Sequence, residues 1–188
     1  MGTLRHRLAV PATGVLVLAA GLGGAVTAAH AASPPAASDH SVPRRPPVID
    51  GFTLTHLPDA LGSRTSEHTY TWGDVGFRNL VWESQLPNGA YRVDLNAHIL
   101  RGDRLTDHTS LHQFLTDYLE RDPDTWQPTE VQLGNRTVHA AETDVFWLVR
   151  PGVAVWLSTR PGRLDRTDLL TTAEGIREIG QQSPTDPP

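Results

Sequence analysis

The chain has 188 residues, 38% of them hydrophobic, and its 16 basic and 21 acidic residues give a formal net charge of −5. This length suits one domain, and the acidic balance argues against nucleic acid as a partner, because affinity for phosphate backbones depends on clustered cations. The sequence contains no cysteine. Disulfides, thiol catalysis and cysteine metal sites are therefore excluded, and the apolar core must supply the stability.

The first 31 residues are predicted to be a secretion signal. Arg5 and Arg7 precede an uncharged run over residues 8–29, and Ala29-His30-Ala31 offers small residues at the two positions that a signal peptidase recognises. Because the signal takes two arginines and no acid with it, we expect a secreted, extracytoplasmic chain of net charge −7. The alternative is localisation at the membrane through an uncleaved anchor, since the run is long enough to span a bilayer.

Residues 32–47 are rich in Pro, Ala and Ser and are predicted to be a solvated linker. Residues 181–188 are predicted to be a disordered tail by the same criterion. Between them, residues 48–180 carry the hydrophobic patterning of a globular domain. After cleavage of the signal, no part of this domain is expected to enter a membrane.

The first half of the domain has mostly the pattern of β-strands. Strands are predicted over residues 52–55, 70–72, 77–83 and 91–99. The last of these alternates most regularly, with apolar residues at odd positions and polar residues at even positions. Val93 and Leu95 on its apolar face are expected to lie beneath the helix that follows, while the polar face is open to solvent.

A helix is predicted next, because apolar residues recur on one face at helical spacing. These residues are Leu111, Phe114, Leu115, Tyr118 and Leu119. Thr109 or Ser110 is expected to cap the start of this helix, and Asp122-Pro123 to end it.

The second half of the domain returns to strands and closes with a helix. Strands are predicted over residues 130–133, 137–141, 144–149 and 153–159, with a turn at Pro151-Gly152. Trp147 and Trp156 are expected to pair across the last hairpin. A second helix is predicted from about Thr167 to Gly180. Without regular βαβ alternation, this pattern predicts an α+β fold in which a single antiparallel sheet carries two helices packed on one face.

The polar face of residues 91–99 supplies the candidate binding residues. They are Arg92, Asp94, Asn96 and His98. Such a face lines a ligand site if the sheet is uncovered there, and otherwise it is the solvated side of a half-buried sheet. The five tryptophans favour an aromatic cleft for sugars, lipids or peptides, with core packing as the default for most of them.

Histidines and acids gather around the start of the first helix. They are His98, Asp103, Asp107, His108 and His112. His108 and His112 have the four-residue spacing that lets two imidazoles reach one metal ion, with Asp107 or His98 as a third ligand. His108, however, is expected to precede the first helical turn, which breaks this geometry. We therefore predict no metal site, and the sequence implies no cofactor.

Signatures of catalysis are absent from the sequence, which has no Gly-x-Ser-x-Gly elbow, no His-Glu-x-x-His motif and no phosphate loop with lysine. Arg101-Gly102-Asp103 matches an adhesion tripeptide and Asn135-Arg136-Thr137 a glycosylation acceptor, but tight turns explain both. We expect no catalytic residues. The preferred interpretation is a non-enzymatic domain that binds a ligand or a cell-envelope protein, and the alternative is a small secreted hydrolase.

Parts of the domain resemble bacterial proteins. Residues 145–157, followed by residues 168–176, resemble the final hairpin and closing helix of extracytoplasmic domains found on some anti-sigma factors. Ile49-Asp50-Gly51-Phe52, residues 80–83 and residues 101–105 are similar to uncharacterised secreted proteins of high-GC actinobacteria. The resemblance implies an exported α+β domain and supplies no catalytic residues.

Overall fold

The computed structural model describes residues 45–180. The predicted signal peptide, most of the predicted linker and the predicted tail lie outside the described residues. The elements in chain order are β1 (Val48–Ile49), β2 (Phe52–Leu54), β3 (Arg64–Trp72), β4 (Val75–Gln85), β5 (Tyr91–Arg101), α1 (His108–Tyr118), β6 (Thr129–Leu133), β7 (Arg136–Ala140), β8 (Asp144–Arg150), β9 (Val153–Ser158), α2 (Arg166–Glu174) and β10 (Ile176–Glu178).

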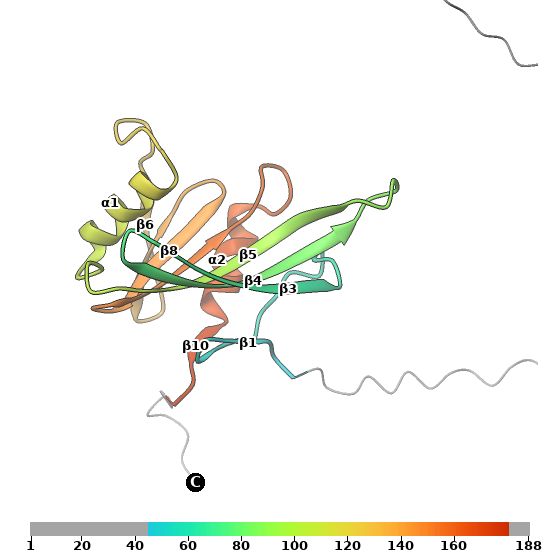
Figure 1. Cartoon of the computed structure of the whole chain (residues 1–188), viewed down its shortest axis with the longest axis horizontal. Coiled ribbons are helices and arrows are strands. Elements are labelled where there is room, and N and C mark those ends of the chain that lie inside the picture. The colour runs from blue at the N-terminus through green and yellow to red at the C-terminus, as the bar shows by residue number, and fades with distance from the viewer. Residues whose placement is uncertain (1–44, 181–188) are drawn as a thin grey trace, which may run out of the picture. The chain divides into compact units, whose positions relative to one another are not determined.

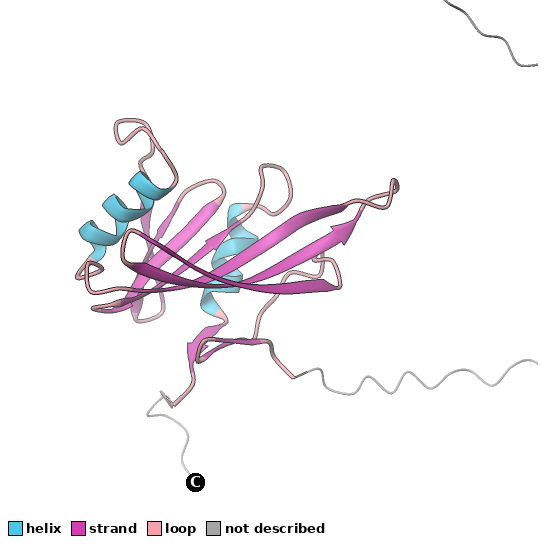
Figure 2. Cartoon of the chain, in the orientation of Figure 1, coloured by secondary structure: helices cyan, strands magenta, loops and turns pink. Residues whose placement is uncertain are grey.

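The strands form two antiparallel sheets (Figure 1, Figure 2). The large sheet has seven strands in the order β3-β4-β5-β9-β8-β7-β6, and the small sheet has three in the order β1-β2-β10. After β5, the chain passes through α1 to β6 at the edge of the large sheet. It then returns inward strand by strand, so that β9 pairs with β5 in the centre.

The prediction of a single sheet with two helices on one face is wrong. Besides the second sheet, the two helices lie on opposite faces of the large sheet: Phe114 of α1 packs in one layer with Phe146 and Trp156, whereas Leu169 of α2 packs in the other with Trp147. Successive residues of a strand point to opposite faces of the sheet, so Phe146 lies in one layer and Trp147 in the other. Trp156 lies opposite Phe146 in the hairpin register, and the predicted pairing of Trp147 with Trp156 is also wrong.

The first helix begins earlier than predicted. Asp107 is its N-cap: the Asp107 side chain accepts a hydrogen bond from the Ser110 amide at 2.8 Å, and the Ser110 hydroxyl accepts one from the Asp107 amide at 3.0 Å. This reciprocal pair is a capping box, which satisfies two backbone donors that would otherwise lack partners. Thr109 and Ser110 are therefore not the cap, and His108 is the first helical residue.

The second helix ends earlier than predicted, at Glu174, and the chain turns into β10 before Gly180. Gly175 is the C-cap, and glycine is required there because a Cβ atom at this position would lie 2.5 Å from the backbone nitrogen of His56. The Gly175 carbonyl also accepts a hydrogen bond from the Thr55 amide at 3.0 Å. This close approach ties the end of α2 to the segment after β2, and β10 then pairs with β2.

Strand β5 differs most from its predicted role. Leu95 is fully buried, but it belongs to the layer beneath α2 and not to the layer beneath α1. A register shift between Trp82 and Glu83 of β4 leaves Asp94 as an extra residue in β5, which is a β-bulge. Asp94 and His98 are buried, so the predicted polar face of this strand is not open to solvent along its length.

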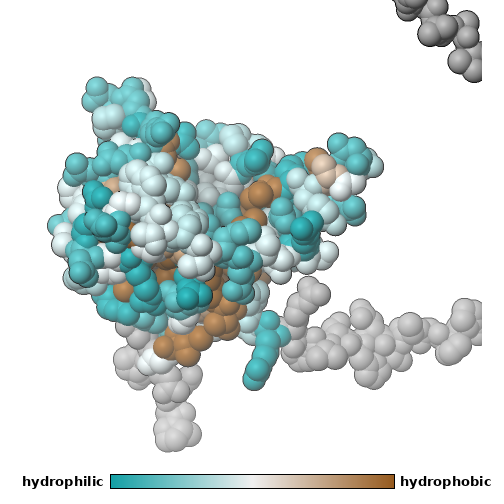
Figure 3. Space-filling view, in the orientation of Figure 1, coloured by the Kyte–Doolittle hydropathy of each residue, from teal (hydrophilic) through white to brown (hydrophobic). Residues whose placement is uncertain are grey.

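On the face seen in Figure 3, hydrophilic residues predominate over α1, and hydrophobic residues gather near β1 and β10. Val48 and Ile179 belong to this end of the domain, with exposed fractions of 49% and 57%. Among residues 45–180, no helix is both long enough and apolar enough to cross a membrane.

We expect Leu95→Ala to lower the free energy of unfolding by about 3 kcal/mol, because it leaves a cavity in the layer beneath α2. The matched control is Asn96→Ala, one residue along and on the other face. Its cost should stay below about 1 kcal/mol, since the Asn96 Oδ1 atom has no hydrogen-bond partner to lose among the described residues. Chemical denaturation of both variants measures the difference, and equal losses would contradict this assignment of faces.

Candidate ligand-binding site

Three polar residues form a row across the centre of the large sheet. Asn96 on β5 pairs with Ser158 on β9, and Ser158 pairs with Asp144 on β8. Trp156 lies two residues before Ser158 and belongs to the layer beneath α1. The row therefore lies on the face of the sheet that α1 covers. The residues that follow α1, including Arg121, lie beside this row.

The row forms part of a pocket of about 270 Å³. Its polar lining consists of Asn96, Arg121, Thr143, Asp144, Ser158, Thr159 and Arg160. Val93, Leu119 and Trp156 complete the wall. The pocket therefore joins a strand end, the segment after α1 and the loop after β9, which are distant in sequence.

Asp144 lines this pocket and is buried, with hydrogen bonds to its carboxylate. Its exposed fraction is 3%, and its carboxylate accepts hydrogen bonds from Trp156 Nε1 at 2.9 Å and from Thr143 Oγ1 at 2.8 Å. Arg121 Nη2 lies 3.7 Å from Asp144 Oδ2. A buried carboxylate with two hydrogen-bond donors and a nearby guanidinium group already has partners within the protein, so it can orient its neighbours without requiring a ligand.

Asn96 differs from Asp144 because its polar group is unsatisfied. The Asn96 Oδ1 atom is buried and has no hydrogen-bond partner among the described residues. Buried acceptors without a partner are rare in folded proteins, and a bound molecule or an ordered water commonly supplies the missing donor. Arg121 and Arg160 at the same pocket supply donors.

His98 lies next to this row, two residues after Asn96 on β5. Its ring stacks on Trp156 with centroids 4.0 Å apart, and its Nε2 atom lies 3.4 Å from Ser158 Oγ. Burial lowers the pKa of His98 to about 3, so the imidazole is neutral in the folded protein near neutral pH.

Ser158, His98 and Asp144 therefore lie close together without forming a catalytic relay. In a relay, a carboxylate accepts a hydrogen bond from the second imidazole nitrogen and stabilises the imidazolium that forms. Here the Nδ1 atom of His98 has no partner among residues 45–180, and the Asp144 carboxylate bonds to Trp156 instead. A histidine of such low pKa is also a weak general base.

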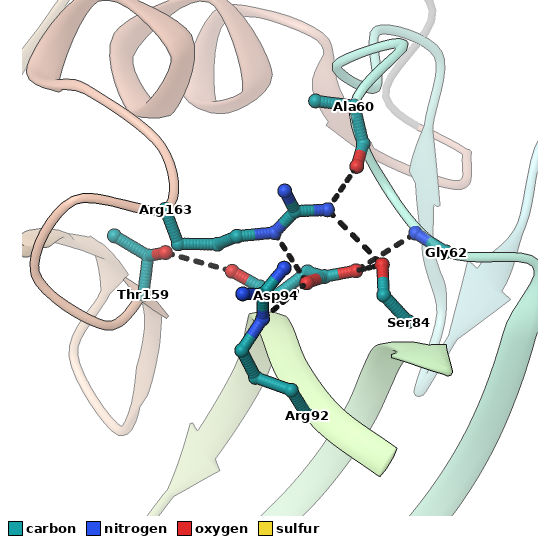
Figure 4. A network of polar contacts seen from close by, with 7 residues as sticks. All are labelled: Ala60, Gly62, Ser84, Arg92, Asp94, Thr159 and Arg163. Carbon is teal, nitrogen blue, oxygen red and sulfur yellow. Dashed lines mark hydrogen bonds and ion pairs between the residues drawn. The ribbon is translucent and has the colours of Figure 1, made fainter. Parts of the chain in front are cut away.

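The structure separates the four candidate binding residues. Asn96 lines the pocket and His98 stacks behind it, whereas Arg92 and Asp94 belong to another polar cluster (Figure 4). The β-bulge at Asp94 interrupts the strict alternation on which the four-residue face depended.

The second cluster is a network centred on Asp94, which has an exposed fraction of 0%. Its carboxylate accepts hydrogen bonds from Arg163 Nε, from the Ser84 hydroxyl and from the Gly62 amide (Figure 4). Burial opposes ionisation, but these hydrogen bonds outweigh it and lower the pKa of the Asp94 carboxyl. Thr159 Oγ1 donates to the Asp94 carbonyl at 2.7 Å. The network thus joins β4, the loop before β3 and the loop after β9 to β5, and both oxygens of the Asp94 carboxylate already accept hydrogen bonds within it.

The residues considered for a metal site are also separated. His108 and His112 lie on α1, Asp107 caps that helix, and His98 lies beneath Trp156. Within the described part of the chain, no group of three His, Asp or Glu side chains is placed to hold a metal ion.

The two short motifs lie in turns, as predicted. Arg101 donates to the Asp50 side chain and, at 3.0 Å, to its carbonyl, while the Leu105 amide donates to the Gly102 carbonyl at 3.0 Å. Asn135 lies with Gly134 in the turn between β6 and β7. Both motifs therefore have structural explanations.

Comparisons of the chain with protein-family models, with curated proteins and with solved structures find no match. The predicted resemblance to secreted actinobacterial proteins and to domains of anti-sigma factors stays a prediction.

Proposed function

We propose that the protein is a non-enzymatic extracytoplasmic binding domain, and that its ligand is a small polar molecule in the pocket formed by Asn96, Arg121, Asp144, Ser158 and Arg160. Export rests on the predicted signal, which lies outside the described residues. The observation that carries the binding role is the buried, unsatisfied Asn96 Oδ1 atom in a pocket that also contains two arginines.

The lining indicates the chemistry of the ligand. Asn96 Oδ1 requires a hydrogen-bond donor, such as a hydroxyl group, whereas the guanidinium groups of Arg121 and Arg160 favour a carboxylate. The volume of about 270 Å³ lies just below the usual range of ligand pockets, which limits the ligand to a molecule about the size of one sugar. A small hydroxylated organic acid satisfies all three requirements.

The test uses D-glucuronate as the probe and D-glucose, which lacks the carboxylate, as its matched control. We expect saturable binding of glucuronate, followed by the NMR signal of the Trp156 indole N–H, which bonds to Asp144 in the pocket. Arg121→Ala should weaken binding at least about tenfold, which corresponds to about 1.4 kcal/mol. Arg78→Ala, at a mostly exposed side chain outside the pocket, should leave binding unchanged.

Two results would overturn the proposal. One is the absence of any shift of the Trp156 signal with either probe or with acetate. The other is ester hydrolysis that Ser158→Ala abolishes, since it would favour the alternative of a small secreted hydrolase. The contact of 3.4 Å between His98 and Ser158 is the observation in favour of that alternative, and the missing carboxylate at His98 Nδ1 argues against it.

A further inference from the structure

Three histidines lie between α1 and the neighbouring strands β7 and β8. His108 and His112 are one helical turn apart on α1, and His139 is on β7. The rings of His108 and His139 have centroids 5.2 Å apart. The prediction of no metal site depended on His108 preceding the helix, and the capping box at Asp107 removes that premise.

Each of these histidines has one ring nitrogen that is buried and has no hydrogen-bond partner among the described residues. The atoms are His108 Nδ1, His112 Nε2 and His139 Nε2. Buried nitrogens of this kind are usually paired with a protein group, a water or an ion. A neutral imidazole nitrogen with a free lone pair is also the group that binds Zn²⁺.

Packing fixes the plane of the His139 ring, which stacks on Phe146 with centroids 5.3 Å apart. A ligand ring that is already held in place loses less conformational freedom when it binds an ion. His112 stacks on Trp126 with centroids 5.2 Å apart, so it has to leave this stack to reach an ion held by the other two rings.

The separation of His108 and His139 matches that of two zinc ligands. A Zn–N bond of about 2.0–2.1 Å places the ion about 3.2 Å from the ring centroid, so two imidazoles at a tetrahedral angle have centroids about 5.2 Å apart. The observed value is 5.2 Å. Glu130 lies opposite His139 in the β6–β7 register and adds a negative charge near the pair, which favours a cation there.

We propose that His108 and His139 bind one late first-row dication, with Zn²⁺ as the principal candidate, and that His112 rotates to become the third ligand. The rotation is required because no three such side chains among residues 45–180 are placed around an ion as they stand. The site would join α1 to β7, the strand next to the edge strand β6. It is separate from the ligand pocket at the other end of α1, and neither proposal depends on the other.

The test is calorimetric titration of Zn²⁺ into the chelator-treated full chain near neutral pH. We expect one ion per chain with a dissociation constant in the micromolar range or below. His108→Ala and His139→Ala should each weaken binding at least about tenfold, and His112→Ala should weaken it by a smaller factor. His68→Ala, at an exposed histidine on β3, is the matched control and should bind as the unsubstituted chain does.

Absence of binding, or equal losses at His68 and His139, would overturn the proposal. A second measurement avoids any effect of the substitutions on folding. In the unsubstituted chain, the NMR signals of the His108 and His139 ring nitrogens should shift on saturation with Zn²⁺, whereas those of His68 and His98 should not. Shifts confined to the latter two would also contradict the site.

Discussion

Arg163→Ala is expected to lower the free energy of unfolding by about 3 to 5 kcal/mol near neutral pH. The substitution removes the strongest partner of the Asp94 carboxylate, whose exposed fraction is 0%. Arg163 also donates to Ser84 Oγ at 3.0 Å and to the Ala60 carbonyl, so β4 and the loop before β3 lose contacts as well. Chemical denaturation gives the difference directly.

The matched control is Arg92→Ala. Arg92 Nε lies 3.7 Å from the same carboxylate, but its side chain is 41% exposed, so its loss should cost less than about 1 kcal/mol. The cost of Arg163→Ala should also shrink as the pH falls, because protonation of Asp94 removes the uncompensated buried charge. Equal costs for the two arginines, or a cost independent of pH, would contradict the role given to this network.

The unsubstituted protein is expected to lose stability as the pH falls below about 6.5, and His98 should account for a loss on the order of 4 kcal/mol by a pH of about 3. Burial lowers the pKa of His98 to about 3 in the folded state. The unfolded chain therefore binds a proton at His98 through this window while the folded chain does not, and protonation favours unfolding. Stability from this group is complete above the unfolded pKa and declines below it.

His98→Phe isolates this contribution. Phenylalanine keeps an aromatic ring for the stack on Trp156 but cannot bind a proton, so the free energy of unfolding should depend less steeply on pH between about 6.5 and 3. His68→Ala, at an exposed histidine, should keep the slope of the unsubstituted protein. Identical slopes for all three chains would show that His98 does not titrate as a buried group.

The Asp94 network and the proposed ligand pocket share one segment. Thr159, which donates to the Asp94 carbonyl, also lines the pocket, and Arg160 follows it. The network therefore fixes the loop after β9, which forms one wall of the pocket. We infer that its role toward a ligand is to position this wall.

The sequence alone predicted most of the strands and the first helix. The alternation at residues 91–99 and the apolar stripe around Phe114 are local patterns, and both elements occur as β5 and α1. The buried run Val153 to Leu157 in β9 was also predicted as a strand. A strand that is apolar at every position has both of its faces buried, so this run indicates that helices cover both faces of the sheet.

Only the tertiary structure decided which residues meet. The bulge at Asp94 changes the side to which a carboxylate points, and α2 ends at Glu174, where the backbone of Gly175 approaches His56. The pocket row and the approach of His139 to His108 depend on strand pairings between distant segments. The spacing of apolar residues determines whether a segment forms a helix or a strand, because it depends on neighbours in the sequence. Which face of a strand is buried, and which strand it pairs with, depends on the apolar area that the whole chain buries.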